Sequence, residues 1–525
     1  MSRTELFASL RRSLRIAGAL ERDRIPTDEA LERAAEEAWS RRRFLKTTAA
    51  ATAAATVAPL MFPRAAHAAG DPRIVILGAG AAGLTAAFRL QQQGLHATIL
   101  EAAPRVGGRM YSLQNHFPDG QIAELGGELI DSEHHAVRNL AKELGLELMD
   151  LTYLDGSNGH DYYVGGRLTK ADNDWIEAFR PVAEAIRRSV GEDGCEVDFR
   201  RGSDRAKGLD RMSVRQWLDQ NGVKGSIRAI IDAAYTGEYG LPLDEQSALN
   251  LLCLIGTDDD AFRIFGASDE RYRTKLGNGS IPVRLAQALE RPVELGTVVE
   301  AIRNRGEGYE IAIVRGGTPD IIQADILITT IPLTVMRNLD LARLQLPRLQ
   351  RDAINLIGYG TNAKMMVGMS ARPWVLMNCT AYTFTDLPFQ ACWESSRGQQ
   401  GTHAILTNFA GGGLGLKLGE GTLQERAREF VGQVEQVFPG VAAAYTGQAV
   451  RQLWPKYEYS LGSYSCFKPG QYQRFYRALE APQGRLIFAG EHTAAESGFM
   501  NSAVESGERA AVAVLGMVGR AARAA

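Results

Sequence analysis

The clearest pattern of apolar and polar positions in the chain begins at residue 74. An apolar run, Ile74 to Leu77, is followed by small residues at helical spacing and then by a second apolar run, residues 97–100, which ends in Glu101. Short apolar runs on both sides of a helical segment are typical of neighbouring buried strands. The pattern therefore predicts a strand, a turn, a helix and a second strand.

Three glycines occupy the turn of this unit. Gly78 permits a tight turn, Gly80 permits close approach of the backbone to a pyrophosphate, and Gly83 permits close packing of the helix on the strand. The N-terminus of the helix would face the phosphates. Glu101 lies where a carboxylate can accept hydrogen bonds from a ribose. The unit therefore predicts a dinucleotide-binding site.

The periodicity changes along the rest of the chain. Residues 151–265 have helical periodicity with few strand signals, whereas strand signals return from about residue 270. Helices are predicted at residues 134–144, 283–289 and 423–438, and a long helix at the C-terminus. We predict an α/β protein, α+β overall, with a discontinuous Rossmann-like nucleotide domain and a substrate domain of mixed sheet and helices. The nucleotide domain is expected to comprise residues 71–150, 270–331 and 451–525, and the substrate domain residues 151–269 and 332–450.

The N-terminal region has the pattern of an export signal. Residues 40–46, Ser-Arg-Arg-Arg-Phe-Leu-Lys, match a twin-arginine motif, a weakly apolar stretch follows at 47–62, and Ala66-His67-Ala68 offers a cleavage site. We therefore expect residues 40–70 to engage the twin-arginine export machinery and the protein to be periplasmic or secreted. A disordered Ala-rich linker is the alternative. The charged lead at residues 1–39 either binds something or reflects a wrong start codon.

Composition narrows the class of protein. At 525 residues the chain is long enough for two or more domains, and its apolar (45%) and charged (23%) fractions are those of ordinary globular proteins. The net charge of −2 gives no reason to expect nucleic acid as a partner. The eight histidines are scattered, so no metal site is predicted. The five cysteines, at positions 195, 253, 379, 392 and 466, are predicted to be buried free thiols.

Further motifs carry a family resemblance. The glycines alone do not separate NAD from FAD, but residues 105–109, Arg-Val-Gly-Gly-Arg, add a second glycine pair close to the same pyrophosphate. The chain resembles the flavin-dependent amine oxidase family, which includes monoamine, polyamine and L-amino acid oxidases. The resemblance covers residues 71 to about 516, and its motifs lie at 73–109, 123–131, 298–332, 359–369, 454–464 and 485–507.

The resemblance implies FAD as the cofactor and assigns its contacts. Glu101 would bind the adenosine ribose, Arg109 the pyrophosphate, and Val298 the adenine through its backbone, while Glu491 would lie near the ribityl chain and Met500 against the flavin ring. The full set implied is Gly78, Gly80, Ala81, Ala82, Gly83, Glu101, Ala102, Gly108, Arg109, Gly126, Gly127, Glu128, Val298, Trp454, Gly490, Glu491 and Met500.

The same resemblance implies three catalytic residues. Lys364 matches the family's active-site lysine, which holds a water next to flavin N5, and Tyr464 and Phe499 match the two aromatic rings that hold the amine. From the local pattern alone, Lys364 could instead reach solvent, and each aromatic could be an ordinary core residue.

Two departures from the family pattern bear on cofactor and substrate. Ser463 stands where many animal monoamine oxidases carry the cysteine that bonds to FAD, and Cys466 is out of register, so we predict non-covalent FAD. L-amino acid oxidases bind the substrate carboxylate with an arginine shortly after the glycine pair that corresponds to residues 126–127, but the segment after Gly127 in this chain has no arginine. Asp131 lies where plant-type polyamine oxidases carry an acidic residue facing a distal amine, so Asp131 is predicted to bind substrate; a surface carboxylate is the alternative.

The predicted reaction is oxidation of a primary or secondary amine to an imine and then an aldehyde, with molecular oxygen reduced to hydrogen peroxide. One alternative is an L-amino acid oxidase or tryptophan 2-monooxygenase, which needs a carboxylate-binding arginine such as Arg263. Others are a flavin desaturase or a non-catalytic exported flavoprotein. The sequence is compatible with a homodimer.

Overall fold

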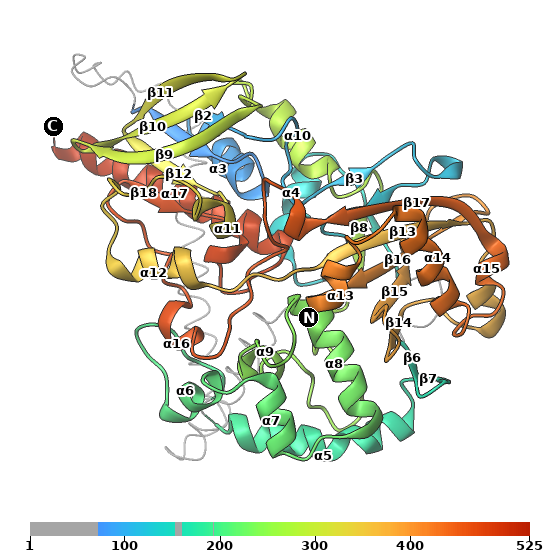
Figure 1. Ribbon diagram of the computed structural model, residues 1–525. Helices are drawn as coiled ribbons and strands as arrows, with labels where there is room; N and C mark the ends of the chain where they lie inside the picture. The colour runs from blue at the N-terminus through green and yellow to red at the C-terminus, as the bar shows by residue number, and fades with distance from the viewer. Residues whose placement is uncertain (1–71, 153–159, 193, 525) are drawn as a thin grey trace, which may run out of the picture. The chain divides into compact units, whose positions relative to one another are not determined.

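The computed structural model describes residues 72–152, 160–192 and 194–524, and Pro72–Ala525 form one compact unit (Figure 1). The charged lead (1–39) and the predicted export signal (40–70) lie outside the described residues. Among the residues described, no helix is both long enough and apolar enough to cross a membrane.

A four-stranded parallel sheet carries the dinucleotide motif. The strand order is β18-β12-β1-β2, and every pair is parallel. The strands are β1 (Ile74–Leu77), β2 (Ala97–Leu100), β12 (Ile326–Thr329) and β18 (Leu486–Phe488). Strands from all three predicted nucleotide segments therefore meet in one sheet.

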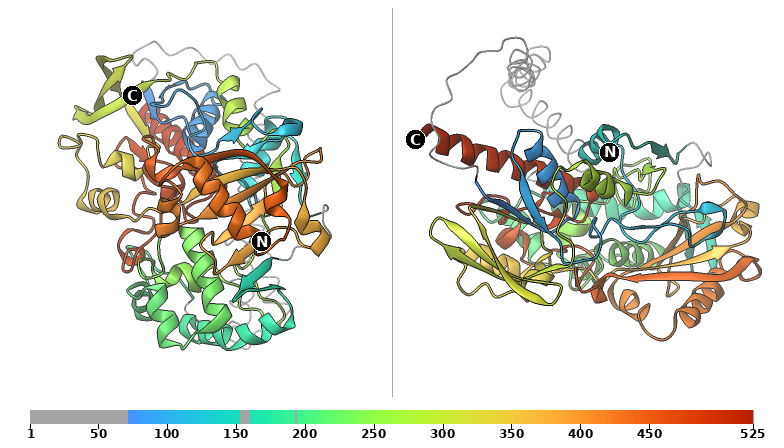
Figure 2. Two further views of the ribbon diagram at one scale, coloured as in Figure 1. Left: turned by 45° about the vertical axis from the view of Figure 1, so that its right-hand side comes forward. Right: turned by 90° about the horizontal axis from the view of Figure 1, so that it is seen from above.

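Alternation along β1 separates two layers. Ile74 and Ile76 pack with residues of α3 (Ala81–Gln91), α4 (His135–Glu143), α10 (Ser280–Ala288) and α17 (Met500–Ala524). Val75 and Leu77 face the other way, towards the antiparallel sheet of β9 (Thr297–Arg305), β10 (Gly308–Arg315) and β11 (Thr318–Ala324), and towards α11 (Leu333–Met336) and α12 (Arg348–Leu356). Figure 2 shows α17 on one side of the parallel sheet and the β9–β11 sheet on the other.

A seven-stranded sheet forms the second part of the molecule, in the order β17-β13-β16-β15-β14-β6-β7. All its pairs are antiparallel except β14 with β6. Its strands are β6 (Asp161–Val164), β7 (Arg167–Lys170), β13 (Ala363–Met369), β14 (Thr383–Thr385), β15 (Ala391–Glu394), β16 (Ala404–Ala410) and β17 (Tyr445–Leu453). Helices α13 (Gly412–Lys417), α14 (Leu423–Val434) and α15 (Val441–Ala444) lie beside it.

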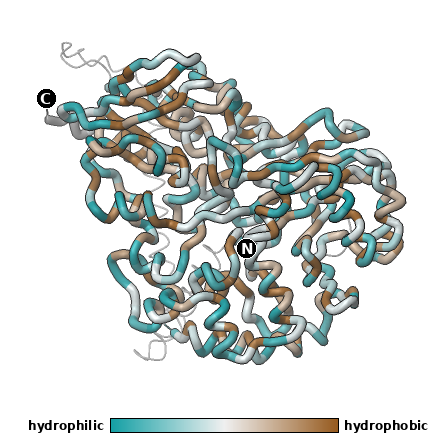
Figure 3. Tube along the Cα trace, in the orientation of Figure 1, coloured by the Kyte–Doolittle hydropathy of each residue, from teal (hydrophilic) through white to brown (hydrophobic). Residues whose placement is uncertain are grey.

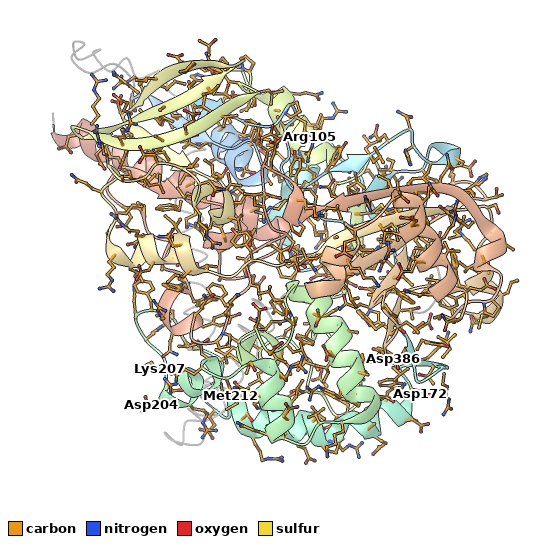
Figure 4. All side chains as sticks on the ribbon, viewed as in Figure 1. Arg105, Asp172, Asp204, Lys207, Met212 and Asp386 are labelled. Atoms are coloured by element: carbon orange, nitrogen blue, oxygen red, sulfur yellow. A yellow bond between two sulfur atoms is a disulfide. The ribbon has the colours of Figure 1, made fainter. Side chains whose placement is uncertain are left out.

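Five helices pack around a further core that includes Phe179, Trp217 and Tyr235. They are α5 (Asn173–Val190), α6 (Asp204–Asp210), α7 (Val214–Gln220), α8 (Gly225–Tyr239) and α9 (Ala248–Leu252). Asp172 begins α5, since its side chain accepts hydrogen bonds from two backbone N–H groups of the first turn (Figure 4). Hydrophobic and hydrophilic residues alternate along these helices, as Figure 3 shows.

The predicted fold class is confirmed, and so are the helices expected near residues 134–144, 283–289 and 423–438. Residues 151–265 were predicted to be mostly helical with few strand signals, and the strands β6 and β7 were not located within them. These strands are four residues each and lie at the edge of the sheet. Such a short hairpin at a sheet edge gives little periodic signal against the long helical pattern that follows.

The prediction for the cysteines was wrong for one pair. Cys195 and Cys253 form a disulfide with their Cα atoms 6.0 Å apart, although they are 58 residues apart in sequence. The loop after α5 meets the end of α9 there, an approach that sequence spacing does not reveal. Cys379, Cys392 and Cys466 are buried free thiols, as predicted.

Candidate active site

A cavity of about 770 Å³ begins at the carboxyl ends of β1 and β2 and extends to the seven-stranded sheet. Ligands of open α/β sheets bind outside these strand ends. Every residue that the sequence assigns to the cofactor, catalysis or substrate lines this cavity, except Gly83 and Asp131. The structure therefore brings together motifs from residue 78 to residue 500.

The glycine turn shapes one end of the cavity. Gly78 has φ +102°, and no protein atom lies within 4 Å of the position that a Cβ on Gly80 would take. A Cβ on Gly83 would lie 2.1 Å from the carbonyl oxygen of Gly78. These are the tight turn, the open backbone and the close helix–strand packing that the sequence predicts.

Glu101 closes the end of β2 beside this turn. Its carboxylate accepts hydrogen bonds from the backbone N–H of Ala79 (2.7 Å) and of Ala103 (2.8 Å). Burial raises the pKa of Glu101, and these N–H groups oppose the rise. The carboxylate thus ties the first glycine turn to the end of the second strand.

The second glycine pair completes a backbone cradle. Gly107 N donates to Ala79 O (2.8 Å), and a Cβ on Gly108 would lie 3.5 Å from the Cα of Gly80. Arg105, labelled in Figure 4, donates to Gly108 O (2.8 Å). Two glycine backbones beside a helix N-terminus fit a pyrophosphate.

An ion pair joins the two ends of the chain at the middle of the cavity. Arg109 donates to Glu491 (2.9 Å) and to Ser463 O (2.7 Å). Glu491 also accepts from Ser465 Oγ (2.8 Å) and from Gly498 N (2.9 Å). Burial opposes ionisation of Glu491, but the charges of Arg109 and His492 and the hydrogen bonds from Arg109 and Ser465 together hold the pKa of Glu491 below its usual value.

Gly126 and Gly127 allow close approach of other protein segments. A Cβ on Gly126 would lie 1.8 Å from Arg109 O, and one on Gly127 would lie 2.7 Å from the sulfur of Met500. The indole N–H of Trp454 donates to Leu125 O (3.1 Å). The glycine pair therefore packs this segment against both the N-terminal and the C-terminal motifs.

Lys364 lies on β13, whose neighbouring residues Met365 and Val367 pack in the core on the opposite face of the sheet. Its ammonium donates to Glu124 O (3.0 Å), Gly126 O (2.8 Å) and the Glu128 carboxylate (2.7 Å). The side chain is buried, so this pairing offsets the cost of removing a charge from water. Burial opposes ionisation of Glu128, but the charge and hydrogen bond of Lys364 hold the pKa of Glu128 below its usual value.

Tyr464 and Phe499 both line the cavity. The Tyr464 hydroxyl donates to the backbone oxygen of Glu238 at the end of α8, and the Phe499 ring packs on His134 with centroids 5.1 Å apart. A Cβ on Gly498 would lie 3.4 Å from the Tyr464 ring. The two aromatics predicted to hold the amine thus border the same cavity as Lys364.

Sequence reasoning missed four residues at this end. The Trp393 and Phe409 rings have their centroids 5.4 and 5.9 Å from Lys364 Nζ, and Glu238 and Glu270 also line the cavity. Phe409 is the direct partner of Lys364 in the β13–β16 ladder. Strand pairing is the signal that would have found it.

Asp131, predicted to bind substrate, lies outside the cavity lining. It is buried rather than exposed at the surface. Its carboxylate accepts from Ser268 Oγ (2.9 Å) and Glu270 N (2.7 Å), so it orders the loop before β8 (Tyr272–Thr274). Glu270, which that loop carries, lines the cavity instead.

Fold and site together define a class of protein. A parallel sheet with a glycine cradle for a dinucleotide leads into a cavity that ends at a buried lysine among aromatic rings, which is the arrangement of a two-part, cofactor-dependent oxidoreductase. A family model for flavin containing amine oxidoreductases matches residues 81–515. The chain belongs to this family, whose cofactor is a flavin.

Several relatives span most of the chain. It is 27% identical over 461 residues to an amine oxidase [flavin-containing] of Danio rerio, covering 85% of this chain and 86% of the relative. Amine oxidase [flavin-containing] B of Mus musculus is 26% identical over 464 residues, with 85% and 86% covered.

Solved structures share the fold. A putrescine oxidase bound to putrescine superposes with a TM-score of 0.72 at 21% identity, covering 85% of this chain and 99% of that one. Cyclohexylamine oxidase from Brevibacterium oxydans IH-35A superposes with a TM-score of 0.71 at 22% identity, covering 86% and 100%.

Proposed function

We propose that the protein oxidises a primary or secondary amine with non-covalently bound FAD and molecular oxygen, yielding an imine, which hydrolyses to an aldehyde, and hydrogen peroxide. The observation that carries this proposal is that one continuous cavity contains both the cofactor motifs and the predicted catalytic residues. This cavity joins the glycine cradle at Gly80 and Gly108 to Lys364 and to the aromatic rings of Tyr464 and Phe499.

One group of residues would hold the cofactor, and another would position the amine. A bound flavin would supply the electron sink for this two-electron oxidation. The cradle and Glu101 would hold its nucleotide half. Tyr464 and Phe499 would orient a neutral amine by shape and by the ring faces. Lys364, fixed by Glu128, would place a buried positive charge at this end of the cavity.

The first experiment is anaerobic mixing of purified holoprotein with amines and amino acids while the flavin absorbance is followed. Bleaching by amines but not by amino acids is the expected result. Bleaching by amino acids alone would favour the L-amino acid oxidase alternative. That alternative receives no support from Arg263, which is exposed, pairs with Asp258 (2.7 Å) and is not part of the cavity lining. Arg271, Arg273 and Arg397, which line a smaller neighbouring cavity, would then be the residues to test.

The environment of the cysteines supports non-covalent attachment of the cofactor. Ser463 lines the cavity and hydrogen bonds to Asn362, whereas Cys466 is buried in the helical core, where it accepts a hydrogen bond from Asn250. Acid precipitation should therefore release a yellow supernatant. A yellow pellet would contradict this part of the proposal.

We also propose export by the twin-arginine route, on the motif at residues 40–46 and on the Cys195–Cys253 disulfide, which suits an oxidising compartment. Replacing Arg41 and Arg42 by lysine should retain the protein in the cytoplasm of a bacterial host. Unchanged periplasmic or extracellular activity of that variant would contradict the proposal.

A further inference from the structure

The substrate end of the cavity carries more negative than positive side chains. The basic residues that line the whole cavity, within the described part of the chain, are Arg109 and Lys364, and each pairs with a carboxylate, Glu491 and Glu128 respectively. Glu238 and Glu270 add two further carboxylates near the aromatic rings. A cavity with this charge balance favours a ligand with more positive charge than one amine supplies.

Glu270 is held in place by a specific backbone arrangement. It has φ +44°, a conformation that non-glycine residues rarely adopt, and its N–H donates to the buried Asp131 carboxylate (2.7 Å). Asp131 also binds Ser268 Oγ on the same loop (2.9 Å). Such strain persists where surrounding contacts fix it, and it is concentrated at functional sites.

The electrostatic surroundings of Glu270 suit a cation. Burial is the largest of the causes that raise its pKa to about 8, and the charges of Asp131 and Glu238 raise it further. The Tyr382 hydroxyl and the charge of Arg397 act in the opposite direction. A bound ammonium would relieve the repulsion among these carboxylates and favour the ionised form of Glu270.

Glu270 lines both the main cavity and a smaller one of about 70 Å³. Arg271, Arg273 and Arg397 line the smaller cavity, so a cation would bind Glu270 from the main cavity. Glu238 lies one residue before the end of α8, where its backbone oxygen accepts from Tyr464. The charge of Glu238 acts on both Glu270 and Tyr464, so the two carboxylates lie close to each other and to the aromatic site.

We propose that Glu270, assisted by Glu238, binds a second ammonium group of the substrate, so that the preferred substrates are aliphatic diamines rather than monoamines. This inference rests on the proposed amine oxidation at the same site, and it assigns that site a substrate class. The second ammonium is recognised by charge and takes no part in the oxidation.

The test compares two amines of equal size with the holoenzyme. Putrescine and n-pentylamine have the same number of non-hydrogen atoms, and the second ammonium of one is a methyl group in the other. We expect putrescine to have the higher kcat/KM, and Glu270→Gln to lower its kcat/KM by about 10- to 100-fold, the usual effect of losing a charged hydrogen-bond partner. The kcat/KM of n-pentylamine should change much less.

Three further variants separate binding from folding. Glu238→Gln should lower the putrescine preference less than Glu270→Gln does. Tyr382→Phe should also lower this preference, because Glu270 loses a hydrogen bond that stabilises its ionised form. Glu177→Gln, at an exposed position of α5, controls for loss of one negative charge and should change neither amine. The dissociation constant of putrescine, taken from the concentration dependence of the rate of flavin reduction under argon, should rise in Glu270→Gln by a similar factor.

Each remaining outcome overturns the inference in a recognisable way. Equal kcat/KM for both amines in the wild-type enzyme would refute the diamine preference while leaving amine oxidation intact. A Glu270→Gln variant that slows both amines equally would place Glu270 at the reacting amine instead. If neither amine bleaches the flavin, the proposed function fails and the inference fails with it.

Discussion

The two ends of the cavity are built from different parts of the polypeptide. The dinucleotide end consists largely of backbone, with Gly78, Gly80 and Gly108 within about thirty residues of one another. The substrate end consists of side chains on separate strands, with Lys364 on β13, Trp393 on β15 and Phe409 on β16. Local backbone conformation therefore determines the geometry of the dinucleotide end, and sheet register determines that of the substrate end. Substitutions should act through steric clashes at the dinucleotide end and through unpaired charge at the substrate end.

The largest effect is expected for Lys364→Met at the substrate end. The change leaves the Glu128 carboxylate buried without its partner, which should cost about 3–5 kcal/mol of unfolding free energy at pH 7. Flavin reduction by amines should slow on the order of 100-fold. Denaturant unfolding and anaerobic stopped-flow mixing measure the two quantities.

Charge can be separated from shape at this position. Since Lys364 lowers the pKa of Glu128, the stability that the pair contributes is present above the ordinary glutamate pKa and is lost as the pH falls through the lowered value. The deficit of Lys364→Met should therefore shrink in acid, where Glu128 takes up a proton. Adding Glu128→Gln should restore stability at pH 7. A deficit that neither acid nor the second change reduces would contradict a charge effect.

The matching test at the dinucleotide end is Gly83→Ala. The added Cβ would lie 2.1 Å from Gly78 O, so α3 must move from β1, at a cost of about 2–3 kcal/mol and with loss of bound flavin. The cost should be the same at every pH. Gly432→Ala is the control, because this exposed glycine of α14 has no neighbour near a Cβ and alanine there should stabilise by about 0.5–1 kcal/mol. Full flavin content in Gly83→Ala would refute the steric account.

Glu491→Gln tests whether the two ends depend on each other. The change leaves the Arg109 guanidinium facing a neutral amide, and because Arg109 is partly exposed we expect a loss of about 2 kcal/mol. Flavin affinity, measured by fluorescence titration, should fall together with the melting temperature. A variant that loses stability but binds flavin normally would show that the pair serves folding alone.

The smallest effect concerns pH and the proposed second ammonium site. Glu270 has a pKa raised to about 8, so it is protonated below that pH and ionised above it in the free enzyme. The ratio of kcat/KM for putrescine to that for n-pentylamine should therefore rise by about 3- to 10-fold as the pH increases through 8. The rise should be absent in Glu270→Gln. A ratio that falls with pH would contradict the assignment.

Local motifs made the dinucleotide end predictable. The strand, the glycine turn and Glu101 follow one another in sequence, and each glycine has a steric reason that the sequence pattern already implies. Lys364 was also predicted, because the residues on both sides of it match the family motif at 359–369. The same resemblance assigned the substrate contact to Asp131, whereas Glu270, to whose N–H it binds, is the carboxylate that lines the cavity, because residue-by-residue transfer does not say which carboxylate faces the cavity.

Residues brought together by long-range pairing were not predictable. Phe409 reaches Lys364 because β16 pairs with β13, and Glu270 reaches the cavity because Asp131, 139 residues earlier, binds its N–H. The disulfide between Cys195 and Cys253 was not predicted either, because the fold brings together two residues that are 58 positions apart. Periodicity and spacing describe neighbours in sequence, and these contacts depend on the packed fold.

The strand order has a consequence for how the protein is made. The central strand β1 pairs with β12, and β12 pairs in turn with β18, which ends at residue 488 of 525. A ribosome that adds about 5–20 residues per second needs roughly half a minute to two minutes for the whole chain. For about half of this time β1 lacks its partner β12, and Arg109 lacks Glu491 until near the end of synthesis. We therefore expect cofactor capture to be among the last events in biosynthesis.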